Sequence, residues 1–452
     1  MKSLLSRARV PTGAARAPRG LTYWLRVAVV AIVPALLLVA GGETDARGGQ
    51  QWFTAYGASH GQRFTSPVLT GSSVRMLVRP TVSGNSIRVK LENTLGQAPV
   101  VFSAVYIGKQ DSGASVVKNS NTQVTFDGHP GLSLAPGAGA YSDPIKFKVE
   151  AFETYSVSID VTSAQDISSH FLGLVSNYMV AGVHAADPSA TGYVQVPDNN
   201  TGTAGATWPT YWIAAIDVEA PSTTGTVVLF GDSITDGRCS TRTDHGALSG
   251  VVQKDVYQRW ADILAERLSE LPANKSKAVA NEGIAGNRII SGGTGPTALA
   301  RMDRDVLDRQ GATHVVFFIA TNDISGGQLA PAVIAGAQTV IDRAHAAGLK
   351  IIGVTVIPRG SAAGWTTSME QQRIAVNDWM RNTANLDGII DFAELMKGPI
   401  VPANGAEQIK LGYACFDGVH PNDLGYDLMG NYIDLSLFDN QGEWNNGHGN
   451  GK

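Results

Sequence analysis

Hydrophobic and polar residues alternate in short runs through the first half of the chain, from about residue 51 to residue 221. An alternation with a period of two indicates β-strands that bury one of their faces. Turn-forming residues such as Ser83-Gly84-Asn85 separate the runs. The clearest alternating runs are residues 73–79, 86–92, 145–149 and 155–161. Short strands at this spacing predict an antiparallel β-sandwich of the jelly-roll kind.

The pattern changes after about residue 225, where the apolar runs become continuous and segments with helical periodicity separate them. Strands that are apolar on both faces are typical of a parallel sheet covered by helices. The apolar runs are residues 226–230, 314–319 and 350–356. The helical patterns cover residues 256–270, 330–347, 367–383 and 421–435. This alternation of strands and helices predicts a three-layer α/β domain built on a parallel sheet.

The predicted fold class of the chain is therefore α/β, with an antiparallel β-sandwich in front of a parallel-sheet domain. We place the β-sandwich at residues 47–221 and the α/β domain at residues 222–440. A loop rich in Gly, Thr, Asn and Pro over residues 185–209 precedes the change of pattern. The Gly- and Asn-rich tail, residues 441–452, is predicted to be disordered.

The first segment, residues 1–46, has the pattern of a secretory signal peptide. Residues 1–26 carry six basic side chains and no acidic one, and residues 27–40 carry no charge. The uncharged run is shorter than the ~20 apolar residues that a membrane span requires. We therefore expect cleavage between residues 40 and 48 and a secreted or periplasmic protein without stable membrane insertion. The alternative is an uncleaved N-terminal membrane anchor, with the protein facing outside the cell.

Composition and charge exclude several other classes of protein. With 43% hydrophobic and 16% charged residues, the chain is neither disordered nor a coiled coil. A net charge of −4 offers no basic surface for nucleic acid. Two cysteines are too few for a disulfide-dense scaffold or a cysteine-based zinc site, and no metal or organic cofactor is expected. The histidines that form no spaced ligand set are His60, His129, His170, His184, His245, His314, His345 and His448.

Candidate catalytic residues follow the ends of the predicted strands. Ser233, in Gly231-Asp232-Ser233, comes directly after the buried strand 226–230, and parallel sheets bind their ligands at such strand ends. Its hydroxyl could act as a nucleophile, or the residue could simply cap the next helix. Gly283 and Asn322 also follow apolar runs, and they could donate a backbone N–H and a side-chain amide to an oxyanion. The alternative for both is an ordinary turn.

A fourth segment, Asp417-Gly418-Val419-His420, contains a possible base. A histidine can take a proton from a serine hydroxyl, and a carboxylate three residues earlier can orient its ring. The alternative is a surface turn with a solvated histidine. Taken together and in this order, the four segments favour nucleophilic catalysis by Ser233, with His420 as the base and Asp417 as its orienting partner.

In these segments the sequence resembles the SGNH (GDSL) hydrolases. The resemblance covers about residues 225–435, and the part before it looks like the β domain of one subgroup of secreted bacterial and fungal members. It implies a three-layer hydrolase domain in which Ser233 is the nucleophile, His420 the base and Asp417 its orienting partner.

The resemblance also implies an oxyanion hole. Its donors would be the backbone N–H groups of Ser233 and Gly283 and the side-chain amide of Asn322. The sequence departs from the family at Ala320, where a glycine usually stands two residues before the asparagine. The additional methyl group could narrow the site or shift the loop.

The function implied is that of an exported serine esterase that works through an acyl-enzyme without a cofactor. Exported members of the family often deacylate polysaccharides, and the sequence shows no amphipathic lid for lipid. We therefore expect short acyl esters, acetyl above all, with an acylated polysaccharide as the favoured partner. The alternatives are a lipid or aryl ester hydrolase, an acyltransferase with the same triad, and a binding module with an inactive site. The oligomeric state stays open.

The two cysteines flank the candidate triad in the sequence. Cys239 lies six residues after Ser233, and Cys415 lies two residues before Asp417. If Ser233 and His420 meet, the two thiols come close as well. Because we expect export, we predict a Cys239–Cys415 disulfide. The alternative is a pair of buried free thiols.

Two further features carry no assigned role. Ser59, in Gly57-Ala58-Ser59-His60-Gly61, fits the letters of the nucleophile elbow of α/β-hydrolases. That elbow requires a helix after the serine, whereas residues 62–80 predict β structure. Four aromatic residues could line a substrate site, although core or linker packing is the interpretation we favour: Trp208, Tyr211, Trp212 and Trp365.

Overall fold

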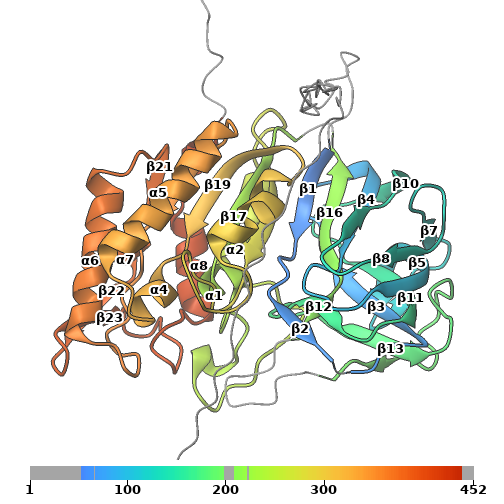
Figure 1. Ribbon diagram of the computed structural model, residues 1–452, viewed down its shortest axis with the longest axis horizontal. Coiled ribbons are helices and arrows are strands. Elements are labelled where there is room, and N and C mark those ends of the chain that lie inside the picture. The colour runs from blue at the N-terminus through green and yellow to red at the C-terminus, as the bar shows by residue number, and fades with distance from the viewer. Residues whose placement is uncertain (1–51, 66, 198–207, 221–222, 440–452) are drawn as a thin grey trace, which may run out of the picture. The chain divides into compact units, whose positions relative to one another are not determined.

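The structure is a computed structural model that describes residues 52–65, 67–197, 208–220 and 223–439 (Figure 1). The predicted signal peptide, its cleavage site and the predicted C-terminal tail lie outside the described residues. By their contacts, the described residues form one compact unit. Within the described ranges, no helix combines the length and the apolar character that crossing a membrane requires.

Two antiparallel sheets form the β-sandwich that the alternating pattern predicts. One sheet has the order β1-β16-β4-β10 with β9 beside β4, and the other has the order β14-β13-β3-β11-β5-β6 with β7 and β8 beside β5. The strands of the first sheet are β1 (Trp52–Gly57), β4 (Gly84–Glu92), β9 (Gly139–Tyr141), β10 (Ile145–Val149) and β16 (Ile213–Glu219). Those of the second are β3 (Ser72–Val78), β5 (Val100–Ser112), β6 (Ser115–Val116), β7 (Thr122–Val124), β8 (Leu132–Leu134), β11 (Tyr155–Ser163), β13 (Asn177–Ala181) and β14 (Val194–Gln195).

The inward faces of the two sheets meet in one hydrophobic core. Phe102 and Trp212 pack edge to face in it, with their ring centroids 5.1 Å apart. Tyr211 and Trp212 are both fully buried there. These two aromatic residues therefore pack in the core, as the favoured interpretation had it, and neither lines a substrate site.

A smaller sheet joins β2 (Gln62–Phe64), β12 (Ile167–His170) and β15 (Thr210–Tyr211) in the order β15-β12-β2. The segment that contains Ser59 connects β1 to β2, so a strand follows Ser59 where an α/β-hydrolase elbow would need a helix. The β structure expected after Ser59 is thus observed.

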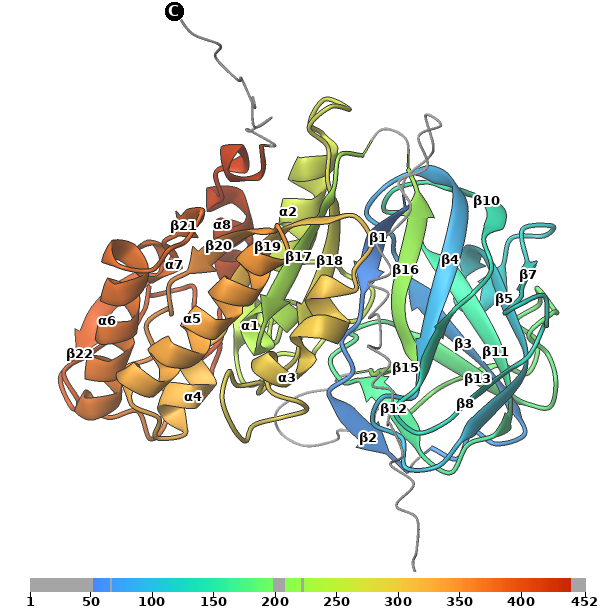
Figure 2. The ribbon, with the colours of Figure 1, turned by 45° about the horizontal axis from the view of Figure 1, so that its top comes forward.

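The C-terminal half contains the predicted parallel sheet, in the order β18-β17-β19-β20-β21 (Figure 2). All four neighbouring pairs are parallel. The strands are β17 (Thr226–Gly231), β18 (Ala278–Gly283), β19 (Ala312–Phe318), β20 (Lys350–Val354) and β21 (Gly388–Ile390). Together with the β-sandwich, this sheet confirms the predicted fold class.

Helices cover both faces of the parallel sheet, which gives three layers. The helices packed on one face are α2 (Trp260–Ser269), α7 (Phe392–Leu395) and α8 (Asp423–Tyr432). Those packed on the other are α3 (Ala298–Met302), α5 (Ala330–Ala346) and α6 (Thr367–Asn382). The remaining elements are the single turns α1 (Ser233–Asp236) and α4 (Thr321–Ser325), the short helices η1 (Asp244–Gly246), η2 (Asp303–Leu307) and η3 (Leu435–Phe438), and the hairpin strands β22 (Lys397–Val401) and β23 (Ala406–Ile409).

Two helices begin later than their sequence patterns predict. Helix α2 begins at Trp260 because Asp255 and Tyr257 have φ of +61° and +55°, which a right-handed helix cannot accommodate. Helix α8 begins at Asp423 because the side chain of Asn422 caps it and accepts the Gly425 N–H at 2.9 Å.

Candidate active site

The strand order brings the candidate residues to one edge of the parallel sheet. Within this sheet, β17 comes first in the sequence, and it lies between β18 and β19, which come second and third. The strand order reverses here, and open α/β sheets bind ligands outside the carboxyl ends of the strands at such a switch point. Ser233 follows β17 and Asn322 follows β19, so both residues lie at this point.

Ser233 is the first residue of α1, which the chain enters directly from β17. Asp232 caps the turn, since its Oδ1 accepts the Ile234 N–H at 3.0 Å. The turn is tight at Gly231, where a Cβ would lie 2.0 Å from Thr235 Oγ1. Ser233 is 5% exposed, and its backbone N–H has no hydrogen-bond partner among the described residues.

His420 lies between Ser233 and Asp417. Its Nε2 is 2.8 Å from Ser233 Oγ, and its Nδ1 is 2.7 Å from Asp417 Oδ2. The other carboxylate oxygen of Asp417 accepts the backbone N–H groups of Val419 at 2.9 Å and His420 at 3.0 Å. Gly418, with φ of +66°, allows the chain to turn this tightly. The structure thus brings the three predicted residues together in one hydrogen-bonded row.

Burial and charge set the protonation states in this row. Burial would raise the pKa of Asp417, but the hydrogen bond and the charge of His420 outweigh it and hold that pKa well below the usual range. Burial lowers the pKa of His420, the guanidinium groups of Arg238 and Arg359 lower it further, and Asp417 offsets them only in part. The imidazole is therefore neutral at pH 7 and free to accept a proton, while the carboxylate is charged.

Gly283 does not offer the free N–H that the family resemblance implies. Its N–H donates to Asn281 Oδ1 at 3.0 Å. A Cβ at this position would lie 2.4 Å from Asp236 N, so a glycine is required for α1 to pack on the end of β18. The observed role of Gly283 is close packing, and this corrects the expectation that its N–H is an oxyanion donor.

Gly286, three residues later, has the available N–H at this edge. Within the described residues this N–H has no hydrogen-bond partner, and φ of Gly286 is +80°. The side chain of Asn322 donates to the carbonyl of Asn287 at 3.1 Å, so Asn322 lies beside this loop and keeps a second amide N–H. Sequence reasoning chose the first of two nearby glycines. Gly286 lies beyond the end of β18, where backbone N–H groups are not paired in the sheet. Its position after the strand was therefore the sequence signal that could have identified it as the donor.

Asp323, the residue after Asn322, fixes the loop that follows Gly286. The carboxylate of Asp323 accepts the backbone N–H groups of Ile289 at 2.9 Å and Ile290 at 3.2 Å. Ala320, which stands where the family usually has glycine, has φ of 169°, an extended conformation that any residue adopts. Its side chain is 1% exposed and belongs to the core beneath the sheet. The additional methyl group therefore packs in the core and does not narrow the site.

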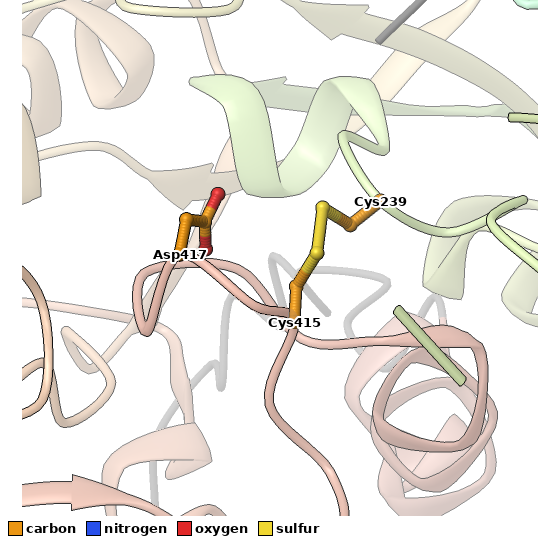
Figure 3. A group of neighbouring side chains, drawn as sticks. All are labelled: Cys239, Cys415 and Asp417. Atoms are coloured by element: carbon orange, nitrogen blue, oxygen red, sulfur yellow. A yellow bond between two sulfur atoms is a disulfide. The ribbon is translucent and has the colours of Figure 1, made fainter. Parts of the chain in front are cut away.

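A disulfide joins Cys239 and Cys415, as predicted (Figure 3). Their Cα atoms are 6.4 Å apart, although 176 positions separate them in the sequence. Cys239 follows α1, and Cys415 lies on the same loop as Asp417. The bond therefore ties the segment after Ser233 to the loop that carries Asp417 and His420.

The ligand atoms of Cys239, Cys415 and Asp417 lie within 4.8 Å of one another, and they form the one candidate metal-binding group found in the described residues. Both sulfur atoms are joined in the disulfide, whereas a metal ion requires thiolates. This group does not fit a metal ion.

The other two aromatic candidates also pack against protein. Trp365 is 5% exposed, and its Nε1 donates to Glu370 Oε2 at 3.1 Å. Trp208 is partly buried against Leu172 and Leu174. Packing, the favoured interpretation, describes both residues.

Comparison with known proteins gives the following matches. Residues 229–428 match the model of the GDSL-like lipase/acylhydrolase family. A GDSL-like lipase from Bacteroides thetaiotaomicron VPI-5482 is similar in structure at 20% identity, covering 47% of this chain and 88% of that one, with a TM-score of 0.33. Axe2, an acetylxylan esterase from Geobacillus stearothermophilus, is similar at 18% identity, covering 48% and 94%, with a TM-score of 0.34. A search of curated proteins found no match.

The segment that matches the family model begins in β17 and ends in α8, so it coincides with the parallel-sheet half of the chain. It includes Ser233, Asn322, Asp417 and His420. The match confirms the predicted resemblance to the SGNH (GDSL) hydrolases over the parallel-sheet half of the chain. The chain therefore contains a domain of the GDSL-like lipase/acylhydrolase family, over residues 229–428.

Proposed function

We propose that this protein is an exported serine esterase with Ser233 as the nucleophile, His420 as the general base and Asp417 as its orienting partner. One observation carries the proposal. The hydrogen-bonded row from Ser233 Oγ through His420 to Asp417, with distances of 2.8 and 2.7 Å, lies at the switch point of a domain of an acylhydrolase family.

The geometry supports a two-step mechanism. In the first step Ser233 Oγ bonds to the ester carbonyl carbon while its proton moves to His420 Nε2. The tetrahedral intermediate then breaks its bond to the alcohol oxygen, and this oxygen takes the proton from Nε2. In the second step His420 removes a proton from water, the water oxygen bonds to the acyl carbon, and Ser233 Oγ leaves with that proton. The negative charge of Asp417 stabilises the imidazolium that forms in both steps.

For the oxyanion hole we propose the N–H groups of Ser233 and Gly286 and the side-chain amide of Asn322. Gly286 takes the place of Gly283 in this proposal because the Gly283 N–H already donates to Asn281. Loss of one such donor typically lowers kcat by about 100- to 1,000-fold.

The proposed substrates are short acyl esters, acetyl above all, on a carbohydrate. The lack of an amphipathic lid in the sequence supports small acyl groups over long lipid chains. The guanidinium groups of Arg238 and Arg359 lie close enough to lower the pKa of His420. Arg359 donates from Nη1 to Thr321 Oγ1 at 3.1 Å and carries further N–H groups, which suit a hydroxyl-rich alcohol better than an apolar one.

Two independent features support export. The basic and then uncharged pattern of residues 1–46 is typical of a signal peptide. The Cys239–Cys415 disulfide is a bond that persists in oxidising compartments outside the cytoplasm.

The test compares p-nitrophenyl acetate, butyrate and octanoate as substrates for the wild type and the Ser233→Ala variant. We expect turnover that falls steeply with acyl length and disappears in the variant. Acetylated oligosaccharides, with and without an acceptor sugar, then distinguish release of acetate from transfer. Turnover that survives in Ser233→Ala would rule out this nucleophile, and a folded wild type inactive on every ester would rule out an esterase.

A further inference from the structure

The β-sandwich half contacts the candidate active site through a buried histidine. His170, the last residue of β12, forms an ion pair with Asp236, whose Oδ1 is 3.2 Å from His170 Nε2. Asp236 is the last residue of α1, the turn that begins with Ser233. The two side chains are almost fully buried, with His170 7% and Asp236 2% exposed. A side chain from the N-terminal half therefore reaches the element that carries the nucleophile.

The same carboxylate also holds the loop with the available N–H group. Asp236 Oδ2 accepts the backbone N–H of Ala285 at 2.8 Å, and Ala285 directly precedes Gly286. One oxygen of Asp236 thus contacts His170, and the other fixes the loop that presents the Gly286 N–H. Any shift of this carboxylate moves that N–H relative to Ser233.

Two partners face the ring of His170. Its Nδ1 lies 3.0 Å from the carbonyl oxygen of Ser59 and its Nε2 lies 3.2 Å from Asp236 Oδ1, and the charged form of the ring carries hydrogen on both nitrogen atoms. Burial, the largest single effect, lowers the pKa of His170, but the charge of Asp236 and the interactions with the Asp236 carboxylate and the Ser59 carbonyl together outweigh it, and the pKa is raised. An imidazolium beside a buried carboxylate favours one position for both groups, because separating them would leave two buried charges unpaired.

The segment around Ser59 holds His170 in place through the carbonyl oxygen of Ser59. Ser59 Oγ donates to Glu282 Oε2 at 2.6 Å. The flanking glycines allow the close approach: a Cβ at Gly57 would lie 2.2 Å from Glu282 Oε1, and a Cβ at Gly61 would lie 2.6 Å from Ile284 Cγ2. The carbonyl that His170 binds is therefore fixed to the end of β18, beside the candidate site.

We propose that His170 is a positioning residue, which acts through Asp236 to hold Ser233 and the Gly286 N–H in register. The inference rests on the proposed function and extends it. The β-sandwich half thus contributes His170, a residue that supports the turn carrying the nucleophile, and it is not a separate module beside the hydrolase domain.

The test uses the full chain with p-nitrophenyl acetate as the probe. His170→Ala removes the ion pair, whereas His170→Gln keeps an amide N–H that can reach Asp236. We expect kcat of His170→Ala to fall about 10- to 100-fold with KM within twofold, because small displacements of reacting groups act on the chemical step. His170→Gln recovers most of this loss.

A matched control separates positioning from stability. His314 is also buried, at 1% exposed, but it lies near the opposite end of β19 from Asn322. His314→Ala should lower the melting temperature while leaving kcat unchanged at temperatures where the variant is folded. If His170→Ala keeps the kcat of the wild type, or if His314→Ala loses as much kcat as His170→Ala, the positioning role is wrong.

Labelling with a fluorophosphonate distinguishes failure of this inference from failure of the proposed function. We expect the wild type to be labelled at Ser233, His170→Ala to be labelled at least tenfold more slowly, and His170→Gln to approach the wild type. A wild type that neither hydrolyses the ester nor reacts at Ser233 would overturn the proposed function and this inference together. A reactive wild type with an equally reactive His170→Ala would overturn this inference alone.

Discussion

His420 shows at the scale of one residue how surroundings set reactivity. Its burial and the charges of Arg238 and Arg359 lower its pKa, while Asp417 offsets this only in part. A base must be neutral to accept a proton, so a lowered pKa extends its working range toward acid. Asp232 shows a different effect of burial, which raises the pKa of its carboxyl to about 7, although this group caps α1 and takes no part in the row.

The pKa of His420 leads to a prediction for the pH profile. Because His420 must be deprotonated, kcat/KM rises as the pH passes upward through its pKa in the free enzyme. Since this pKa is lowered from the ordinary value of 6.5, the acid limb should lie below pH 6.5. The measurement is kcat/KM for p-nitrophenyl acetate from pH 4 to 8. An acid limb centred above pH 7 would contradict the predicted direction.

At the scale of elements, the site is assembled from strand ends and the loops that follow them. The nucleophile lies in a single helical turn, and the base lies in a loop before α8. Neither segment is long enough to fix its own position. The Cys239–Cys415 disulfide joins the two segments, and Asn422, the cap of α8, also donates to the carbonyl of His245 at 2.9 Å.

The disulfide should contribute to both stability and activity. Replacing both cysteines by serine removes the constraint on a loop of 176 residues, and a loss of about 2–5 kcal/mol in the free energy of unfolding is expected. Because the bond ties the two loops of the triad, kcat should fall as well. Urea denaturation and ester turnover measure the two effects. Two reactive thiols in the unfolded, unreduced wild type would show that the bond is absent.

At the scale of the whole molecule, buried charges join the β-sandwich half to the parallel sheet. Arg301 donates to the carbonyls of Gly231 and Glu282, each at 2.8 Å, and so spans the ends of two strands. The carboxylate of Glu282 pairs with Arg309 at 2.5 Å and accepts the hydroxyl of Ser59. The charged side chains of these pairs are fully buried, so each charge is stabilised by its protein partners and not by water.

Breaking this network should be costly. Arg309→Met leaves Glu282 without its cation, and the loss of one partner from a buried pair typically costs about 3–5 kcal/mol. Arg381→Met is the matched control, because Arg381 pairs with Asp391 at 2.8 Å near the surface and should cost about 1 kcal/mol or less. Both values come from urea denaturation. Equal losses in the two variants would mean that the buried network does not stabilise the contact between the halves.

Periodicity was sufficient to predict the fold class, because each strand type has its own pattern of burial. Helix starts were less predictable, since Asp255, Tyr257 and Asn422 act through backbone angles and a side-chain cap. At the candidate site, the spacing of motifs identified the residues that the fold brings together. It could not distinguish Gly283 from Gly286, because the choice depends on which N–H is already bonded.

The sequence by itself predicted the two fold types, the family that residues 229–428 match, the candidate residues Ser233, His420 and Asp417, and the pairing of the two cysteines. These follow from local patterns and from motifs that a parallel sheet gathers at one edge. Only the tertiary structure decided that His170 lies against Asp236, that Ser59 bonds to Glu282, and which glycine has an available N–H. Such contacts join residues far apart in the chain, and their energies depend on burial, which no local pattern specifies.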